Sequence, residues 1–230
     1  MIVMIQKALT YAAHDLQFLL DRCYPKSSAI NFVGNRYQLR KRERMILYRA
    51  LFPKETVRKR RAKLVKLKDF HGNRIILDGY NVTITLENAI KGNLLISCKD
   101  SFVRDISGVF RKYRPSKTTA QAWYHVARLL KRHGPGEVVV ILDSPMSQSG
   151  KLAGMIRSWL TEAGLKTLVE LSKTPENSML AIKGIHCSAD SFILDKAARI
   201  FDLSGHIIKR RMKKRDLIDA DALTRQLPTE

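Results

Sequence analysis

The stretch Arg74-Ile-Ile-Leu-Asp-Gly-Tyr-Asn-Val82 reads as a short buried strand that ends at a carboxylate, Asp78. Gly79 lets the backbone turn tightly after the strand. Tyr80 and Asn81 then offer polar atoms just beyond the strand end, where open parallel α/β sheets bind their ligands. We therefore expect a functional site at this end of the strand.

Three more predicted strands lead to an aspartate, namely 93–100 to Asp100, 137–143 to Asp143 and 184–190 to Asp190. Parallel strands present their carboxyl ends along one edge of a sheet, so these side chains can converge. Carboxylate oxygens are the ligands that Mg²⁺ and Mn²⁺ prefer, and such ions activate water and neutralise charge on a phosphodiester. Aspartate also caps helices after strands, and Asp190 before Ser191 fits that interpretation. For all four positions together, in a chain poor in acids, we favour a catalytic site.

The rest of the chain alternates between strand and helix patterns. Helical spacing covers 118–133, 151–163 and 191–203, and strand patterns cover 138–142, 166–171 and 206–208. The β-branched run at 138–142 is typical of a central strand that is buried on both faces. We predict an α/β fold, an open and mainly parallel sheet with helices on both faces, preceded by a small basic all-helical module. The predicted divisions are 1–69, 70–209 and a basic then acidic tail at 210–230.

The charge of the chain points to a polyanionic partner. The sequence has 42 Lys and Arg against 21 Asp and Glu, a formal net charge of +21. Residues 36–68 hold fourteen of the basic residues and only two acids, which favours phosphate-backbone binding over an ordinary solvated helix face. The basic residues that we expect to contact nucleic acid are Arg36, Arg40, Lys41, Arg44, Arg58, Lys59, Arg60, Arg61, Arg210 and Arg211.

Several other classes find little support in the sequence. No apolar run approaches the roughly 20 residues that span a bilayer, so we expect no membrane partner. The start of the chain makes a poor signal peptide, and the three cysteines form no disulfide framework, so we expect a cytoplasmic protein. Glycine-rich phosphate loops and a G-x-S-x-G nucleophile elbow are absent from the sequence.

Three segments resemble the PIN-like superfamily, particularly its NYN branch: Leu77-Asp-Gly-Tyr-Asn-Val82, Val140-Ile-Leu-Asp-Ser144 and Cys187-Ser-Ala-Asp190. The resemblance spans about residues 70 to 210. It implies a metal-dependent ribonuclease fold in which Asp78, Asp143 and Asp190 ligate the metal and Asn81 orients substrate or water. PIN nucleases usually carry one more acid, and the matching position here falls near Glu176. Asp100 and Asp105 are alternative sources of that acid, by position alone.

The N-terminal part, including Val33-Gly-Asn-Arg-Tyr-Gln-Leu39, resembles an uncharacterised and mainly archaeal family, domain of unknown function four-three-four, which is often joined to a PIN-like part. Together these features predict a ribonuclease for RNA processing or decay that uses Mg²⁺ or Mn²⁺. The alternatives are a non-catalytic RNA-binding protein with a degenerate PIN-like fold, and a binder of nucleotides or small phosphates at the same sheet edge. DNA as the substrate, a homo-oligomer and a ribonucleoprotein partner all stay open.

Overall fold

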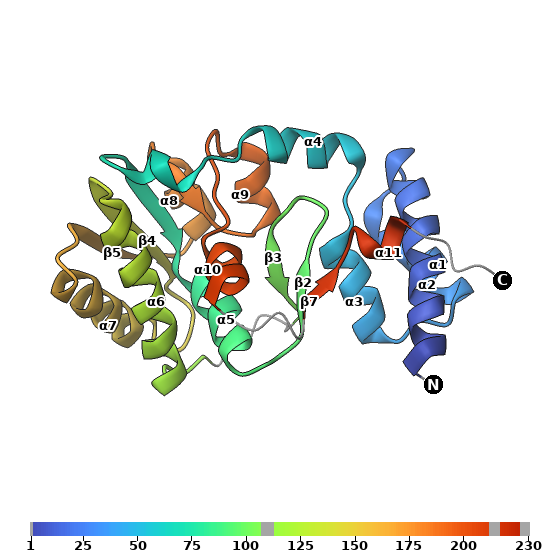
Figure 1. Cartoon of the computed structure of the whole chain (residues 1–230), viewed down its shortest axis with the longest axis horizontal. Coiled ribbons are helices and arrows are strands. Elements are labelled where there is room, and N and C mark those ends of the chain that lie inside the picture. The colour runs from blue at the N-terminus through green and yellow to red at the C-terminus, as the bar shows by residue number, and fades with distance from the viewer. Residues whose placement is uncertain (1, 107–112, 212–216, 226–230) are drawn as a thin grey trace. The chain divides into compact units, whose positions relative to one another are not determined.

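The computed structural model describes residues 2–106, 113–211 and 217–225 (Figure 1). The chain folds into two compact units. The first, here called the helical unit, comprises Met1–Ala62, Leu94–Ile106 and Asp216–Glu230. The second, the parallel-sheet unit, comprises Lys63–Asn93 and Ser107–Arg215. The expected boundary after residue 69 therefore differs from the observed one, because the helical unit also takes two later segments of the chain.

Four helices open the helical unit: α1 (Ile2–Asp21), α2 (Lys26–Arg36), α3 (Lys41–Ala50) and α4 (Lys54–Ala62). The predicted all-helical character of this part of the chain is confirmed. Its core comes from apolar residues at helical spacing, among them Leu16, Val33 and Leu47, which are completely buried. Leu51 and Phe52, which follow α3, join the same core and fix the turn into α4.

A small second sheet belongs to the helical unit. Its strands are β2 (Leu95–Ser97), β3 (Val103–Asp105) and β7 (Leu217–Asp219), in the order β3-β2-β7. β2 pairs antiparallel with β3 and parallel with β7. The short helix α11 (Ala222–Arg225) follows and packs on α1. Residues 217–225 of the expected tail are thus built into this unit, residues 210 and 211 belong to the parallel-sheet unit, and the basic residues 212–215 lie outside the described residues.

The predicted place of the 93–100 strand was wrong. Instead of joining the large parallel sheet, β2 turns back on itself, since Cys98 N donates to the carbonyl of Phe102 at 2.9 Å. Ser101 makes the reversal possible with a left-handed φ of 78°. A local hairpin therefore replaces the crossover that a parallel strand would need.

The parallel-sheet unit is built on β1 (Arg74–Asp78), β4 (Glu137–Asp143), β5 (Thr167–Ser172) and β6 (Ile185–Cys187), in the order β5-β4-β1-β6. All three neighbouring pairs are parallel. Leu77 lies opposite Val140 on one side and Cys187 on the other. Consecutive residues of β1 and β4 are buried, so both faces of the two central strands are covered, as the β-branched run predicted.

Seven helical segments complete this unit: η1 (Leu67–Phe70), α5 (Gly79–Ile90), α6 (Lys117–His133), α7 (Ser149–Glu162), α8 (Pro175–Leu180), α9 (Ser191–Lys196) and α10 (Leu203–Arg211). α5, α6, α7 and α10 pack on one another as a layer, visible around the sheet in Figure 1. α8 packs on β1, β4 and β5. Trp123 of α6 is completely buried. Gly134 ends this helix in a left-handed conformation with φ 54°.

Two local predictions in this unit were wrong. Residues 206–208 belong to α10 and form no strand, because the Asp202 carboxylate accepts the Gly205 N–H at 2.9 Å and caps a helix there. The predicted helix 191–203 stops at Lys196, and Ile200 instead bridges His186 and Leu64 in an extended conformation. No helix in the described part of the chain is long and apolar enough to cross a membrane.

Candidate active site

Asp78 stands at the carboxyl end of β1 and caps α5. Its Oδ1 accepts the N–H of Asn81 at 3.1 Å, and its Oδ2 accepts the hydroxyl of Ser188 at 2.8 Å. Gly79 is required here for packing: a Cβ at that position would lie 2.5 Å from Cδ2 of Leu142 on β4. The start of α5 therefore presses directly onto the neighbouring strand, and this holds the Asp78 carboxylate at the sheet edge.

Asn81 and Ser188 tie the loop after β6 to the end of β1. The Asn81 side-chain carbonyl accepts the N–H of Ala189 at 2.9 Å, and the Ser188 hydroxyl oxygen accepts the N–H of Asp190 at 3.0 Å. The Asn81 Nδ2 group makes no hydrogen bond to the described residues, so this donor is available to a bound molecule. Sequence reasoning missed Ser188 as a site residue, although the S-x-D spacing before Asp190 was its signal.

The other predicted ligands come from three neighbouring segments. Asp143 ends β4 and is half-buried, and Glu176 lies exposed in the first turn of α8. Asp190 is exposed and caps α9, with Oδ1 accepting the N–H of Phe192 at 2.8 Å. The capping interpretation of Asp190 is therefore confirmed. The capping hydrogen bond uses Oδ1 and not Oδ2 of this carboxylate.

Electrostatics show that these carboxylates form one group. Burial is the main cause that raises the pKa of Asp78 to about 6; the hydrogen bonds from Asn81 and Ser188 act against it, and the charges of Asp190 and Glu176 act with it. Burial and then the charge of Glu176 also raise the pKa of Asp143. Repulsion thus links Asp78 to Asp190 and Glu176, and Asp143 to Glu176, at this edge of the sheet.

Tyr80 lies beneath this group. Burial and the nearby Asp143 carboxylate raise its pKa to about 12, so the phenol stays protonated at neutral pH. Its hydroxyl is buried, and no partner for it is present in the described part of the chain. The Tyr80 ring meets Tyr113 edge-on, with ring centroids 5.4 Å apart. A buried O–H donor beside Asp143 adds to the polar character of the site.

Asp100 and Asp105 belong to the helical unit, whereas the acidic sheet edge belongs to the parallel-sheet unit. The Asp100 carboxylate is completely buried, and its Oδ2 accepts a hydrogen bond at 2.7 Å from Arg60 and another from Arg104. The prediction that Asp100 is catalytic was wrong, because both of its oxygens serve a structural ion cluster. Arg60 is only 2% exposed, so its predicted contact with nucleic acid was wrong too.

The remaining predicted nucleic-acid residues have varied surroundings. Arg44 holds the turn before α3, donating to the Leu39 carbonyl and to Asn35 Oδ1, each at 2.9 Å. Arg58 pairs with Glu55 at 2.8 Å, and Arg61 donates to the Lys99 carbonyl at 2.6 Å. The exposed predicted residues are Arg36, Arg40, Lys41, Arg58, Lys59, Arg61 and Arg210. The Arg211 side chain lies outside the described residues.

The oxygen donors suit a hard divalent cation, but they do not form a closed cage. Within residues 2–106, 113–211 and 217–225, no three His, Cys, Asp or Glu side chains are grouped closely enough to hold one metal ion. Mg²⁺ typically binds through one or two carboxylates, keeps several waters and takes further oxygens from a substrate phosphate. Asp78 and Asp143, at the ends of adjacent strands, fit that kind of open site.

Comparison with known proteins places the chain in a family. Residues 67–206 match a domain of unknown function, DUF5616. The chain belongs to the DUF5616 family. Residues 8–63 match a protein of unknown function, DUF434, which confirms the resemblance of the N-terminal part. The DUF5616 match covers the parallel-sheet unit from η1 into α10, and so includes all four acids of the site.

Another protein shares both parts of this arrangement. The uncharacterized protein MJ0935 of Methanocaldococcus jannaschii is 33% identical over 205 residues, which is 88% of this chain and 98% of that protein. No solved structure matches the chain. None of these matches confirms the PIN-like resemblance of residues 70 to 210.

Proposed function

We propose that the protein is a metal-dependent ribonuclease of RNA processing or decay. The observation that supports this most directly is the group of four acids at one edge of the parallel sheet, where burial, and then repulsion from Asp190 and Glu176, raises the pKa of Asp78 to about 6. Such repulsion costs stability, and sites that keep it usually serve a function. A divalent cation would relieve it, since the positive charge favours the ionised carboxylates.

A bound Mg²⁺ or Mn²⁺ would supply a water of lowered pKa and neutralise charge on the scissile phosphodiester. Asp78 and Asp143 would hold the ion directly, and Asp190 and Glu176 would hold it through water. Ser188 keeps the Asp78 carboxylate oriented through its 2.8 Å hydrogen bond. The Asn81 Nδ2 group would donate to a phosphate oxygen or to the attacking water.

RNA is the proposed substrate because the chain carries a net charge of +21 and its acids are few. In the helical unit, Arg40, Lys41 and Lys59 present exposed charges, and Lys59 shares its nearest acid, Glu55, with Arg58. These residues would contact the phosphate backbone without reading bases. DNA carries the same backbone charge, and a direct comparison of the two polymers decides between them.

The test is a Mn²⁺ titration followed by calorimetry, with cleavage of a mixed RNA pool measured on the same samples. Asp143→Asn is expected to lose both metal binding and cleavage while it keeps its affinity for RNA. Glu170→Gln is the matched control, since this acid is exposed on β5 of the same sheet. Equal cleavage by wild type and Asp143→Asn would refute the proposal.

A second function is favoured by one observation: both oxygens of Asp78 already accept hydrogen bonds from the protein. A non-catalytic RNA-binding protein with a degenerate site would keep such an arrangement as a structural cap. In that case the wild type would bind no Mn²⁺ and cleave nothing, yet retain RNA with an affinity that falls steeply as salt rises.

A further inference from the structure

A small cavity lies between α6 and α10 in the parallel-sheet unit. Its volume is about 100 Å³. The residues that line it are Leu67, His125, Leu129, Arg132, His133, His206, Ile207 and Arg210. We call it the His–Arg cavity. Its apolar floor comes from the two leucines and the isoleucine, and every other lining group is a histidine or an arginine.

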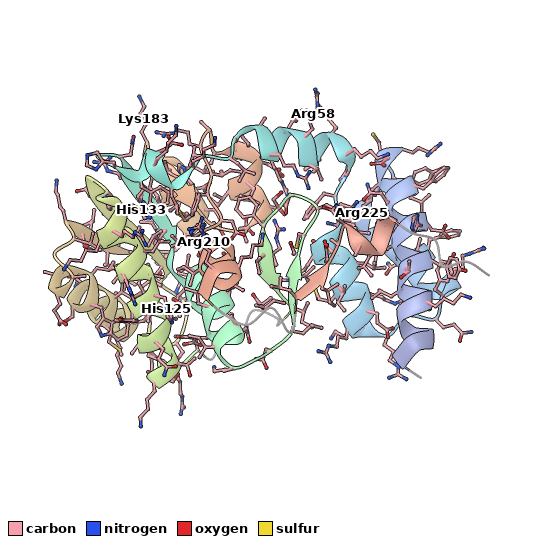
Figure 2. The ribbon with its side chains drawn as sticks, viewed as in Figure 1. Arg58, His125, His133, Lys183, Arg210 and Arg225 are labelled. Atoms are coloured by element: carbon pink, nitrogen blue, oxygen red, sulfur yellow. The ribbon has the colours of Figure 1, made fainter. Side chains whose placement is uncertain are left out.

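Helix geometry explains why these cationic groups meet. Arg132 and His133 follow His125 by seven and eight residues, about two helical turns, and therefore lie on the same side of α6. His206 and Arg210 are four residues apart on α10, which packs against that face. Figure 2 shows His133 and Arg210 close together, coming from the two helices, with His125 further along α6. Two arginines and three histidines thus surround a single hollow.

No carboxylate is among the residues that line this cavity within the described chain. The nearby acids have other bonds: Asp202 caps α10, Asp69 accepts the N–H of Lys66, and Glu87 accepts the hydroxyl of Tyr113. Glu162 on α7 accepts a hydrogen bond from Ser158, and other charged groups on or beside these elements include the lysines Lys66, Lys68, Lys91 and Lys209. An anion would therefore meet a surplus of positive charge with no internal competitor.

Two of the three cavity histidines, His133 and His206, respond to that surplus. Burial, together with the charges of Arg132 and Arg210, lowers the pKa of His133. Burial, Arg210, His133 and Lys209 lower the pKa of His206. Both imidazoles are consequently neutral at pH 7 in the free protein. An anion in the cavity would reverse this effect and favour their protonation, so that binding takes up protons.

The cavity is separate from the acidic site. His133 ends α6, and β4 begins four residues later at Glu137, so this end of α6 lies toward the edge where the strands begin. The four acids lie at the opposite edge, where the strands end. A ligand in the His–Arg cavity would therefore not touch the carboxylates.

We propose that the His–Arg cavity binds a phosphate group. Its size suits one tetrahedral anion, and its two guanidinium groups provide the forked donors that phosphate oxygens prefer. The phosphate is either a free ion or the 5′-terminal phosphate of an RNA. This proposal is independent of the proposed cleavage, because it concerns different residues and is tested by binding alone.

The first experiment titrates the full-length protein with sulfate, a tetrahedral dianion that does not titrate between pH 5.5 and pH 7.5. Calorimetry is expected to show that sulfate binds more tightly at pH 5.5 than at pH 7.5, by roughly tenfold if one proton is taken up per anion. Arg132→Gln should weaken binding by about tenfold or more, since the loss of one charge-assisted hydrogen bond removes at least the roughly 1.4 kcal/mol that corresponds to a factor of ten. Arg128→Gln is the matched control, because it removes the same charge from an exposed position on α6 outside the cavity.

His133→Gln combined with His206→Gln should remove the pH dependence. Absence of sulfate binding at millimolar concentration and pH 5.5 would overturn the proposal. Equal weakening by Arg128→Gln and Arg132→Gln would also overturn it, and would show a solvated basic face only.

The source of the phosphate is decided with a short RNA that carries either a 5′-phosphate or a 5′-hydroxyl. Tighter binding of the phosphorylated RNA, lost in Arg132→Gln, identifies the RNA terminus. Equal binding of the two RNAs, with inorganic phosphate still bound in the cavity, identifies the free ion.

Discussion

Asp100→Asn is expected to destabilise the helical unit strongly. Asp100 is completely buried, and its partners Arg60 and Arg104 are 2% and 5% exposed. One carboxylate thus compensates two buried guanidinium groups, each bonded to it at 2.7 Å. The ring of Phe52 lies against both cations, with its centroid 4.4 Å from Cζ of Arg60 and 5.0 Å from Cζ of Arg104.

The magnitude follows from what the substitution leaves behind. Removal of one partner from a buried ion pair costs about 3–5 kcal/mol, because the remaining charge stays buried without compensation. Two cations depend on Asp100, so we expect the upper part of that range. Asparagine keeps one acceptor oxygen but turns an N–H₂ group toward a guanidinium, and so does not restore the cluster.

The assay is urea unfolding followed by circular dichroism. Tryptophan fluorescence serves as a second probe that follows the parallel-sheet unit, because both tryptophans, Trp123 and Trp159, are in that unit. The circular dichroism transition of the helical unit should move to lower urea. Glu55→Gln is the control, because its ion pairs with Arg58 and Lys59 are exposed and its effect should be small. A loss below about 1 kcal/mol in Asp100→Asn would refute the reasoning.

The same cluster predicts a pH dependence. Burial alone would raise the pKa of Asp100, but Arg104 and Arg60 outweigh it and hold the pKa below its ordinary value. The contribution of Asp100 to stability is therefore present above the unfolded-state pKa and is lost as pH falls through the lower folded-state pKa. Wild type should approach the stability of Asp100→Asn only in strong acid.

Two further predictions concern the parallel-sheet unit. The folded-state pKa of Asp78, about 6, exceeds its ordinary value of 3.8, so the unit should lose stability as pH rises from about 4 to about 6. Asp78→Asn should show a shallower loss and exceed wild type in stability above pH 6, measured by urea unfolding across that range; identical pH slopes would contradict this. Thr83→Val should cost about 1–3 kcal/mol, since the buried Trp123 Nε1–H would lose its 2.9 Å bond to the Thr83 hydroxyl. Thr83→Ser keeps the hydroxyl and loses only the methyl group, so it should cost less; a loss in Thr83→Val no larger than that in Thr83→Ser would contradict the assignment to the hydrogen bond.

Local sequence patterns were sufficient to predict the structure where neighbouring residues alone decide the conformation. Runs of apolar residues at 75–77 and 138–142 predicted buried strands because such runs are stable only between two covered faces. The same pattern predicted that the aspartates after these strands lie along one edge of the sheet, since parallel strands end along one edge. The capping role of Asp190 was visible from Ser191 and the helix pattern that follows it.

Contacts between residues that are far apart in the sequence decided the remaining features of the structure. The sequence around Asp100 resembles that around Asp143, yet a hairpin and two buried arginines, one of them forty residues earlier in the chain, draw Asp100 into the helical unit. Arg60 looks like its exposed neighbours in the sequence, and only tertiary packing buries it. The raised pKa of Asp78 depends first on burial and then on the charges of Asp190 and Glu176, which approach it through strand order and not through spacing along the chain. By itself, the sequence determined the elements and the acids at their ends, because these depend on local periodicity; only the tertiary structure decided which acids share a site, because burial and charge coupling depend on distance in space.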